Sequence, residues 1–143
     1  MEMIISSSAE DTYNAGAKIA LYLKPNDVIA LIGDVGAGKT VFTKGIAKGL
    51  DINEVVSSPT FTLLKEYDGR FKLCHFDVYR ITDVDEMFET GFFEHMENDG
   101  VIVVEWADII DEILPKKHIK ISIEKTGDNE RIINIEKIDR EII

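Results

Sequence analysis

Eight consecutive residues, GDVGAGKT at positions 33–40, have the types and spacing of a loop that binds the phosphates of a nucleotide. Gly33, Gly36 and Gly38 allow positive φ angles, and they leave no side chain between backbone N–H groups and a phosphate chain. The spacing lets Lys39 reach the β- and γ-phosphates and lets the Thr40 hydroxyl coordinate Mg²⁺. A glycine-rich turn without a ligand does not explain these two residues, so the pattern predicts binding of a nucleoside triphosphate.

A phosphate-binding loop of this kind connects a strand to a helix, and the residues on either side of it fit these two elements. Residues 28–32, VIALI, form the short apolar run of a buried parallel strand. Residues 39–50 have the length and composition of a helix, whose positive end would point at the anion. The sequence therefore predicts a strand, a phosphate loop and a helix in direct succession.

Two acidic residues are candidates for the metal side of the site. A nucleotide hydrolase needs a carboxylate at the end of a strand that neighbours the phosphate loop. Glu105 ends the apolar run 101–104 and suits a group aimed at Mg²⁺ directly or through a water molecule. Asp77 lies near the end of a strand pattern at 70–79 and can hold the same Mg²⁺ shell or orient the attacking water. Either acid alone can instead be a helix cap or a surface residue.

The first segment of the chain predicts a strand and a helix before the loop strand. Residues 3–6 suit a short strand. Ser7 with Glu10 fits a capping box for a helix that runs to about Leu23.

Two hairpins and several short helices are predicted in the rest of the chain. The first hairpin joins 60–67 to 70–79 through Asp68-Gly69, a strong turn signal, and the second joins 118–125 to 131–137. Short helices are expected at 83–89, 93–97 and 108–114. Together these patterns predict a three-layer α/β P-loop nucleotide-binding fold with a mixed parallel/antiparallel sheet, as a single domain over residues 1–143.

Composition narrows the class of protein. The apolar share of 45% is that of a soluble globular domain, and no apolar stretch approaches the roughly 20 residues of a membrane span. The start lacks the basic and apolar segments of a signal peptide, so we expect a cytoplasmic protein that does not associate with membranes. The single cysteine, Cys74, lies in a strand pattern without a metal-type cluster and is interpreted as a buried structural thiol.

The net charge of −11 is concentrated in one segment. Residues 81–115 contain eleven Asp and Glu residues and no Lys or Arg. Such a surface repels a phosphate backbone, which argues against strong direct binding of nucleic acid. It can dock on a basic protein partner or be an ordinary solvated acidic face.

Four segments of the chain occur together in one known family. They are the phosphate loop, SSPTFTLLKEY at 57–67, HFDVYR at 75–80 and VEW at 104–106. In this order and spacing the chain resembles the TsaE family, also called YjeE, from about residue 10 to residue 115. The resemblance implies a small bacterial P-loop ATPase, a Mg²⁺-dependent hydrolase required for the threonylcarbamoyl modification of the adenosine beside the anticodon in tRNA.

The resemblance also implies roles for particular positions. Lys39 and Thr40 carry over as phosphate and Mg²⁺ contacts, Glu105 as a metal-associated acid and Asp77 as a second acid needed for hydrolysis. A switch-like loop at Ser58-Pro59-Thr60-Phe61 is expected near the γ-phosphate, with Trp106 beside the site. The expected nucleotide contacts are Gly33, Asp34, Val35, Gly36, Ala37, Gly38, Lys39, Thr40, Thr60 and Trp106, with Lys39 and Asp77 catalytic and Thr40 and Glu105 binding the metal.

The same resemblance implies partners and a mode of action. TsaE proteins act with the TsaD and TsaB proteins, so contact with tRNA is expected only indirectly, through that complex. Hydrolysis of ATP is expected to be weak in the isolated chain and activated by the partners. The base contacts are not fixed by the motifs; residues 10–12 are one option.

Three other functions use a similar phosphate loop or a similar nucleotide switch. A small GTPase needs an N/T-K-x-D sequence, which the chain lacks. A small-molecule kinase clamps the transferred group with arginines in a lid, whereas the chain has four arginines and none within 81–115. A nucleotide-dependent binding module, whose ATP state controls docking, overlaps with the TsaE role and stays open.

Overall fold

The computed structural model describes residues 2–34, 36–57, 64–79, 81, 83–95, 100–115 and 117–137. The strands are β1 Glu2–Ser6, β2 Val28–Ile32, β3 Leu64–Tyr67, β4 Leu73–Asp77, β5 Val101–Glu105, β6 Ile119–Lys125 and β7 Arg131–Lys137. The α-helices are α1 Ala9–Ala20, α2 Lys39–Gly49 and α3 Phe92–His95, and the 3₁₀ helices are η1 Val84–Thr90 and η2 Ala107–Ile113.

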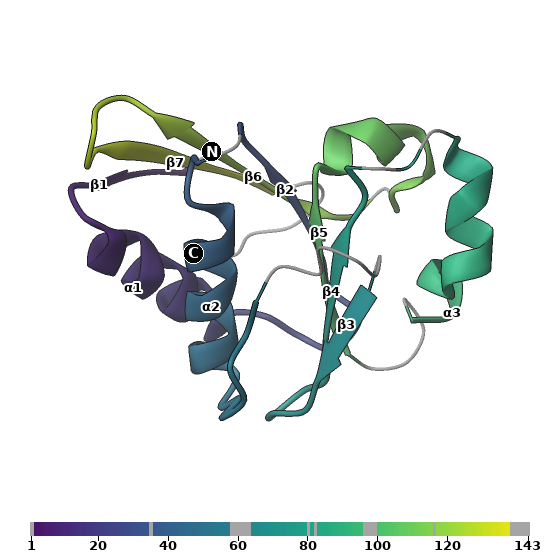
Figure 1. The fold of residues 1–143 in the computed structure, drawn as a ribbon. Helices are drawn as coiled ribbons and strands as arrows, with labels where there is room; N and C mark the ends of the chain where they lie inside the picture. The colour runs from purple at the N-terminus through teal and green to yellow at the C-terminus, as the bar shows by residue number, and fades with distance from the viewer. Residues whose placement is uncertain are drawn as a thin grey trace.

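These strands form a seven-stranded sheet in the order β1-β7-β6-β2-β5-β4-β3. Strands β6, β2, β5 and β4 run parallel, while β3 and β7 are antiparallel to their neighbours in the sheet. Helices α1 and α2 cover one face, and η1, α3 and η2 lie against the other (Figure 1). The prediction of an α/β fold in three layers with a mixed sheet is therefore confirmed.

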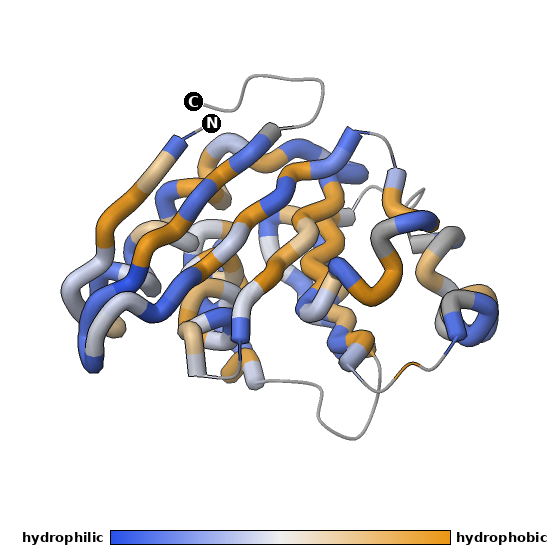
Figure 2. Tube along the Cα trace, turned by 90° about the horizontal axis from the view of Figure 1, so that it is seen from above, coloured by the Kyte–Doolittle hydropathy of each residue, from blue (hydrophilic) through white to orange (hydrophobic). Residues whose placement is uncertain are grey.

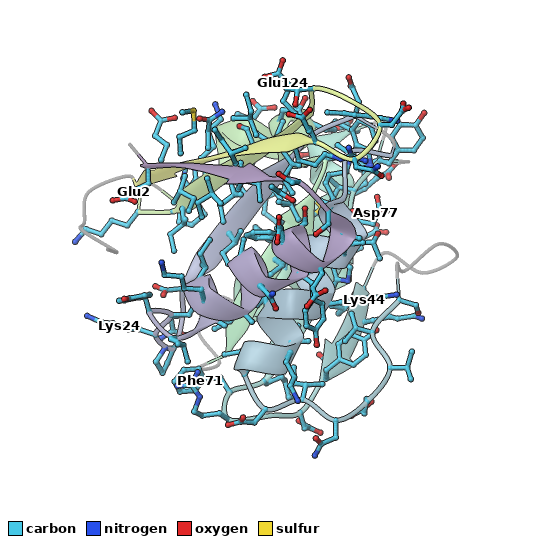
Figure 3. The ribbon with its side chains drawn as sticks, turned by 90° about the vertical axis from the view of Figure 1, so that its left-hand side faces the viewer. Glu2, Lys24, Lys44, Phe71, Asp77 and Glu124 are labelled. Carbon is cyan, nitrogen blue, oxygen red and sulfur yellow. The ribbon has the colours of Figure 1, made fainter. Side chains whose placement is uncertain are left out.

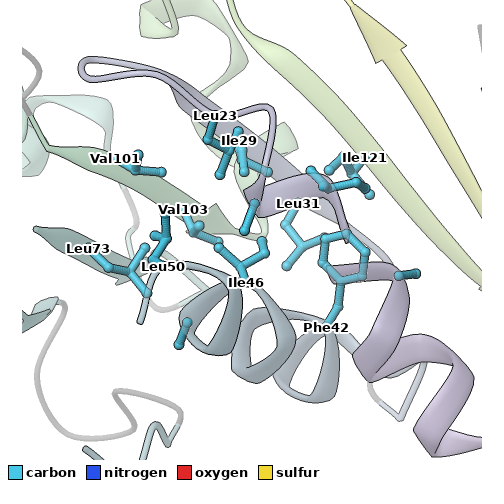
Figure 4. Packing of buried hydrophobic residues seen from close by; sticks show 14 of the residues in the cluster. Leu23, Ile29, Leu31, Phe42, Ile46, Leu50, Leu73, Val101, Val103 and Ile121 are labelled. Atoms are coloured by element: carbon cyan, nitrogen blue, oxygen red, sulfur yellow. The ribbon is translucent and has the colours of Figure 1, made fainter. Parts of the chain in front are cut away.

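The central strands bury side chains on both faces of the sheet. Ile29 and Leu31 of β2 pack against Phe42 of α2 (Figure 4). Their neighbours Val28 and Ala30 belong to the cluster under the other helical layer. Because successive residues of a strand point to opposite faces, a strand covered on both sides reads as a continuous apolar run.

The outer strands have one face on the core. In β6, Ile119, Ile121 and Ile123 are buried, and the residues between them are polar and partly exposed. Hydrophobic and hydrophilic residues accordingly alternate along this part of the sheet (Figure 2). Each such isoleucine contributes roughly 1.5 to 3 kcal/mol by leaving water, which fixes the register of the strand.

The first helix differs from its prediction at both ends. It begins after Ser8 rather than Ser7, because the Ser8 hydroxyl accepts the N–H of Asp11 at 3.0 Å while the Asp11 carboxylate accepts the N–H of Ser7 at 2.9 Å. The pair is similar to a capping box with Asp11 as its acid, except that Asp11 accepts the N–H of the residue before the cap. The helix ends at Ala20, short of Leu23, because the Leu23 N–H bonds the Ala20 carbonyl at 3.3 Å and tightens the last turn.

The hairpin of β3 and β4 is antiparallel as predicted, but its connection is longer. Tyr67 pairs with Leu73, so residues 68–72 lie between the strands. The backbone N–H after the Asp68-Gly69 pair donates to the carbonyl of Leu50 at 2.6 Å. The connection is thus held against the end of α2, and the predicted tight turn is wrong.

The remaining predicted elements are present with small shifts. The predicted short helices occur as η1, α3 and η2, and the second hairpin occurs as β6 and β7. Asp83 caps η1 by accepting the N–H of Asp85 at 3.0 Å. The predicted ends at residues 60 and 97 lie outside the described residues. Within the described part of the chain, no helix has both the length and the apolar character needed to cross a membrane.

The prediction of a buried thiol is confirmed for Cys74. Its side chain lies in β4 and is 1% exposed. Burial raises the pKa of the Cys74 thiol to about 11, because the thiolate would lose its hydration. This residue therefore acts as a small apolar group in the core.

Candidate functional site

The phosphate loop joins the carboxyl end of β2 to the first residue of α2. Gly36 and Gly38 have φ angles of 81° and 105°, in the left-handed region that glycine adopts without strain. Gly38 is also the residue that caps α2, so the loop leads directly into the positive end of the helix. Val35 lies outside the described residues.

Gly33 does not use the positive φ angles that glycine allows, because its φ angle lies outside that region. The lack of a side chain at this position matters for another reason. A Cβ atom at this position would lie 2.7 Å from the carbonyl oxygen of Ile123. The glycine therefore lets β6 approach the start of the loop closely.

Lys39 is folded back over the loop. Its side chain is buried, and its ammonium group donates a hydrogen bond to the carbonyl of Gly33 and lies 3.4 Å above the ring centroid of Trp106. Burial lowers the pKa of Lys39, and the negative charges of Glu105 and Asp77 oppose that shift in part. The lysine is thus held beside the site in a partly desolvated state that an anion would relieve.

Trp106 occupies a strained backbone conformation directly after β5. Its φ angle is 62°, which is rare for a bulky residue. Its N–H bonds the carbonyl of Leu31 at 3.1 Å, and its ring contacts that of Tyr79 with a centroid distance of 4.8 Å. The turn therefore aims the indole at Lys39, so the predicted place beside the loop is observed.

The two candidate carboxylates lie on neighbouring strands in the same register. Asp77 of β4 pairs with Glu105 of β5, each at the carboxyl end of its strand. Lys24 lies shortly before β2 and so marks the edge of the sheet where this strand begins. Asp77 lies on the opposite side of the molecule in Figure 3, at the edge where the parallel strands end. The structure thus brings together the acids that the sequence placed only at the ends of two separate strands, and both lie close enough to act on the charge of Lys39.

The environments of the two acids differ. Glu105 is 3% exposed, and its carboxylate accepts a hydrogen bond from Nε2 of His75 at 2.5 Å. Asp77 is half-buried, and its Oδ1 accepts the N–H of Tyr79 at 3.0 Å. Glu105 is therefore buried and hydrogen-bonded through its side chain, while Asp77 is partly exposed.

His75 is a site residue that the sequence reasoning missed. It is fully buried, and its Nδ1 atom has no hydrogen-bond partner among the described residues. Because an ionised carboxylate only accepts hydrogen bonds, the bond to Glu105 places the proton on Nε2. The signal was present, since His75 lies two residues before Asp77 in β4 and hence on the same face of the sheet.

Arg131, the first residue of β7, was also missed. Its guanidinium donates to the carbonyls of Ala37 and Gly36 in the phosphate loop, at 2.9 and 3.2 Å. It donates as well to the carbonyls of Gly127 and Glu130 in the β6–β7 turn, at 3.1 and 2.9 Å. No sequence motif predicts this contact, because every partner of Arg131 is a backbone carbonyl, which any residue type provides.

Two clefts flank the phosphate loop. The larger, of about 510 Å³, lies on the Trp106 side and is also lined by Asp34, Asp108 and the end of β6. The smaller, of about 100 Å³, lies on the α1 side, and its lining residues are Ser8, Ala9, Thr12, Gly38, Val41, Asp128, Asn129 and Arg131. The loop therefore has an open space on each side.

Some predicted positions cannot be placed. Thr60 and the switch-like segment 58–61 lie outside the described residues. Among the described residues, no group of three or more His, Cys, Asp or Glu side chains is arranged to hold a metal. A cation bound here would therefore need ligands from a nucleotide in addition to those of the chain.

A parallel strand, a loop with left-handed glycines and a helix that starts on Gly-Lys-Thr define the P-loop class of nucleotide-binding α/β proteins. A family model described as "Threonylcarbamoyl adenosine biosynthesis protein TsaE" matches residues 6–133. The chain belongs to this TsaE family.

Individual relatives agree with this assignment. The "tRNA threonylcarbamoyladenosine biosynthesis protein TsaE" of Bacillus subtilis is 49% identical over 125 residues, covering 87% of this chain and 78% of the relative. The protein of the same name from Treponema pallidum is 40% identical and covers 92% and 97% of the two chains. The crystal structure of Bacillus subtilis YdiB superposes with a TM-score of 0.81 at 40% identity, covering 96% of this chain and 85% of that chain.

Proposed function

We propose that this chain binds Mg-ATP and hydrolyses it in support of threonylcarbamoyladenosine biosynthesis on tRNA. The observation that carries the proposal is the phosphate loop at the start of α2, with Lys39 beside the register-paired acids Asp77 and Glu105. P-loop proteins bind the phosphates and the metal ion of a nucleoside triphosphate with such a loop, such a lysine and such acids. The names of the relatives supply the pathway.

The oxygen ligands around the loop fit Mg²⁺. This ion prefers one or two carboxylates together with phosphate oxygens and water, and it does not need a cage of protein ligands. Thr40, the second residue of α2, and Glu105 are proposed to hold it, with Asp77 in its outer shell or on the attacking water. Bound there, Mg²⁺ would neutralise charge that develops on the phosphates. Lys39 would leave the Gly33 carbonyl and donate to the β- and γ-phosphates.

The smaller cleft is the proposed place of the base. It opens beside Gly38 and Val41, so a nucleotide whose phosphates lie on the loop can extend into it. Thr12 lines this cleft, which supports the proposal that a residue of the segment 10–12 contacts the base.

The acidic layer of the fold is proposed to meet the TsaB and TsaD proteins. Phe88 in η1 is 61% exposed and Ile109 in η2 is 38% exposed, and both lie among exposed acids such as Glu86 and Glu112. Apolar groups ringed by charge suit a protein partner better than a nucleic acid. Contact with tRNA would then be indirect.

We expect slow ATP hydrolysis by the isolated chain and faster hydrolysis with TsaB and TsaD. If ATP strengthens partner binding, linkage requires the partners to strengthen ATP binding by the same factor. Turnover and calorimetric affinities, measured with ATP, with ADP and without nucleotide, test both statements. Identical partner affinity in all three states would overturn the switch and leave an independent ATP-consuming enzyme.

Trp106 provides a direct probe of nucleotide binding. Its indole contacts the Lys39 ammonium, so movement of Lys39 toward phosphates should change the tryptophan emission. Because the chain contains a single tryptophan, a fluorescence titration with Mg-ATP reports on this residue alone. Trp106→Phe serves as the blank. A flat titration at a nucleotide concentration that calorimetry shows to be saturating would contradict the proposed movement.

A further inference from the structure

Arg131 joins two parts of the chain that are distant in the sequence. Its Nε and Nη2 atoms donate to the carbonyls of Ala37 and Gly36, and its Nη1 atom donates to carbonyls of the β6–β7 turn. A guanidinium has a rigid planar fork of donors, so bonds on both edges fix the loop relative to the turn. The phosphate loop is therefore attached to the last hairpin of the sheet.

The two loop carbonyls determine where the loop N–H groups point. In a planar trans peptide the C=O of one residue and the N–H of the next point in opposite directions. Holding the Ala37 carbonyl toward Arg131 therefore turns the Gly38 N–H to the side away from Arg131. The Ala37 N–H, after the held Gly36 carbonyl, closes a turn onto Asp34 at 3.0 Å. The arginine thus fixes two peptide planes of the loop, and one of them carries the Gly38 N–H that a phosphate would use.

The charge of Arg131 is not neutralised by an acid. Among the described residues, Arg131 has no carboxylate within ion-pair distance, and its partners are carbonyl oxygens. In a chain of net charge −11, this leaves a positive charge beside the loop, in addition to that of Lys39. A polyphosphate bound to the loop would therefore be attracted by Arg131 without touching it.

We propose that Arg131 is a positioning residue that sets the phosphate loop in its binding conformation before any ligand arrives. The proposal rests on the proposed function in one respect, that the loop binds a polyphosphate. It assigns to the last hairpin a part in nucleotide affinity that the motifs of the loop do not reveal.

Arg70 is a matched control. Its Nη2 atom donates to the carbonyls of Ala20 and Gly49, at 3.3 and 3.1 Å, and so it also joins backbone carbonyls of separate elements. These carbonyls lie at the ends of α1 and α2 that are remote from the phosphate loop. Replacing either arginine by Met removes hydrogen bonds to backbone carbonyls, but only the bonds of Arg131 include the loop.

The first measurement is amide hydrogen exchange in the nucleotide-free protein. For Arg131→Met we expect exchange at residues 36–40 to be faster than in wild type by about tenfold or more, with the core strands unchanged. Arg70→Met should leave these loop amides unchanged. Unchanged loop exchange in Arg131→Met would overturn the proposal.

The second measurement compares the affinities of Mg-ATP and Mg-tripolyphosphate by calorimetry. Tripolyphosphate has no base, so it reports on the loop alone although Arg131 also lines the smaller cleft. We expect Arg131→Met to weaken both ligands by about tenfold or more, Arg131→Lys to recover only part of the loss, and Arg70→Met to bind as wild type. Weaker ATP binding with unchanged tripolyphosphate binding would assign Arg131 to the base and overturn the positioning role.

The two measurements separate this inference from the proposed function. If wild type bound neither ligand, the proposed function would fail, while the exchange of the loop amides would still decide whether Arg131 sets the loop. If Arg131→Met proved unfolded, Arg131→Lys would take its place, since it retains the charge and the length but not the planar fork. In that case, wild-type exchange and affinity in Arg131→Lys would overturn the inference.

Discussion

Replacing Lys39 with methionine is expected to weaken Mg-ATP binding by at least about tenfold, because a charge-assisted contact to phosphate contributes roughly 1.5 to 3 kcal/mol. Methionine is unbranched like lysine and keeps most of the length of the side chain, but it carries no charge. Lys44→Met is the control, since Lys44 lies exposed on the same helix (Figure 3). Calorimetric titration decides the matter, and equal affinity in wild type and Lys39→Met would rule out a working phosphate loop.

The same substitution should raise the stability of the nucleotide-free protein. Burial lowers the pKa of Lys39, which means that its charge is less well solvated in the fold than in water. A neutral side chain of similar volume avoids this cost. A higher melting temperature with weaker ATP binding would show that Lys39 is kept for binding at the expense of stability. A variant that lost both would instead point to general damage of the fold.

Amide substitutions of the two acids are expected to reduce ATP hydrolysis strongly while preserving the fold. Asp77→Asn and Glu105→Gln should each lower kcat about 10²-fold or more, a loss typical for groups that position a metal or a nucleophilic water. The fold should persist because an amide oxygen at position 105 can still accept the hydrogen bond of His75. Rates at saturating Mg-ATP give kcat.

The double variant tests whether the two acids act as a unit. Their strand ends are adjacent, so we expect the combined loss to be much smaller than the product of the single losses. Glu112→Gln removes an exposed acid of η2 and should leave the kcat of the isolated chain unchanged. Strictly multiplicative losses would assign the two acids to separate tasks.

The local patterns of the chain predicted the parts of this structure that depend on periodicity. The apolar runs of β2 and β5 predicted strands that are covered on both faces. The positions of Asp77 and Glu105 at the ends of two strands identified them as candidate site residues. These features are predictable because burial on both sides of a strand constrains every residue in it. The mixed sheet followed from the same reasoning, because the hairpins had their own alternating patterns.

The features that were missed depend on contacts between distant segments. Gly33 was explained by its place in the phosphate loop alone, and the close approach of the β6 backbone to it was not foreseen. Arg131 binds carbonyls more than 90 residues away, and a backbone carbonyl leaves no mark in the sequence. The connection after β3 was misjudged for a similar reason, since its hydrogen bond goes to the end of α2.

The order of the strands has a consequence for the nascent chain on the ribosome. Strand β2 precedes the phosphate loop, whereas its neighbour β6 and Arg131, which contacts the loop, are synthesised much later. Strand β1 likewise cannot form its hydrogen bonds with β7 until β7 has been synthesised. Synthesis therefore delivers the Gly-Lys-Thr motif long before the hairpin that holds it, and the phosphate loop can be held in place only after β6 and β7 have left the exit tunnel.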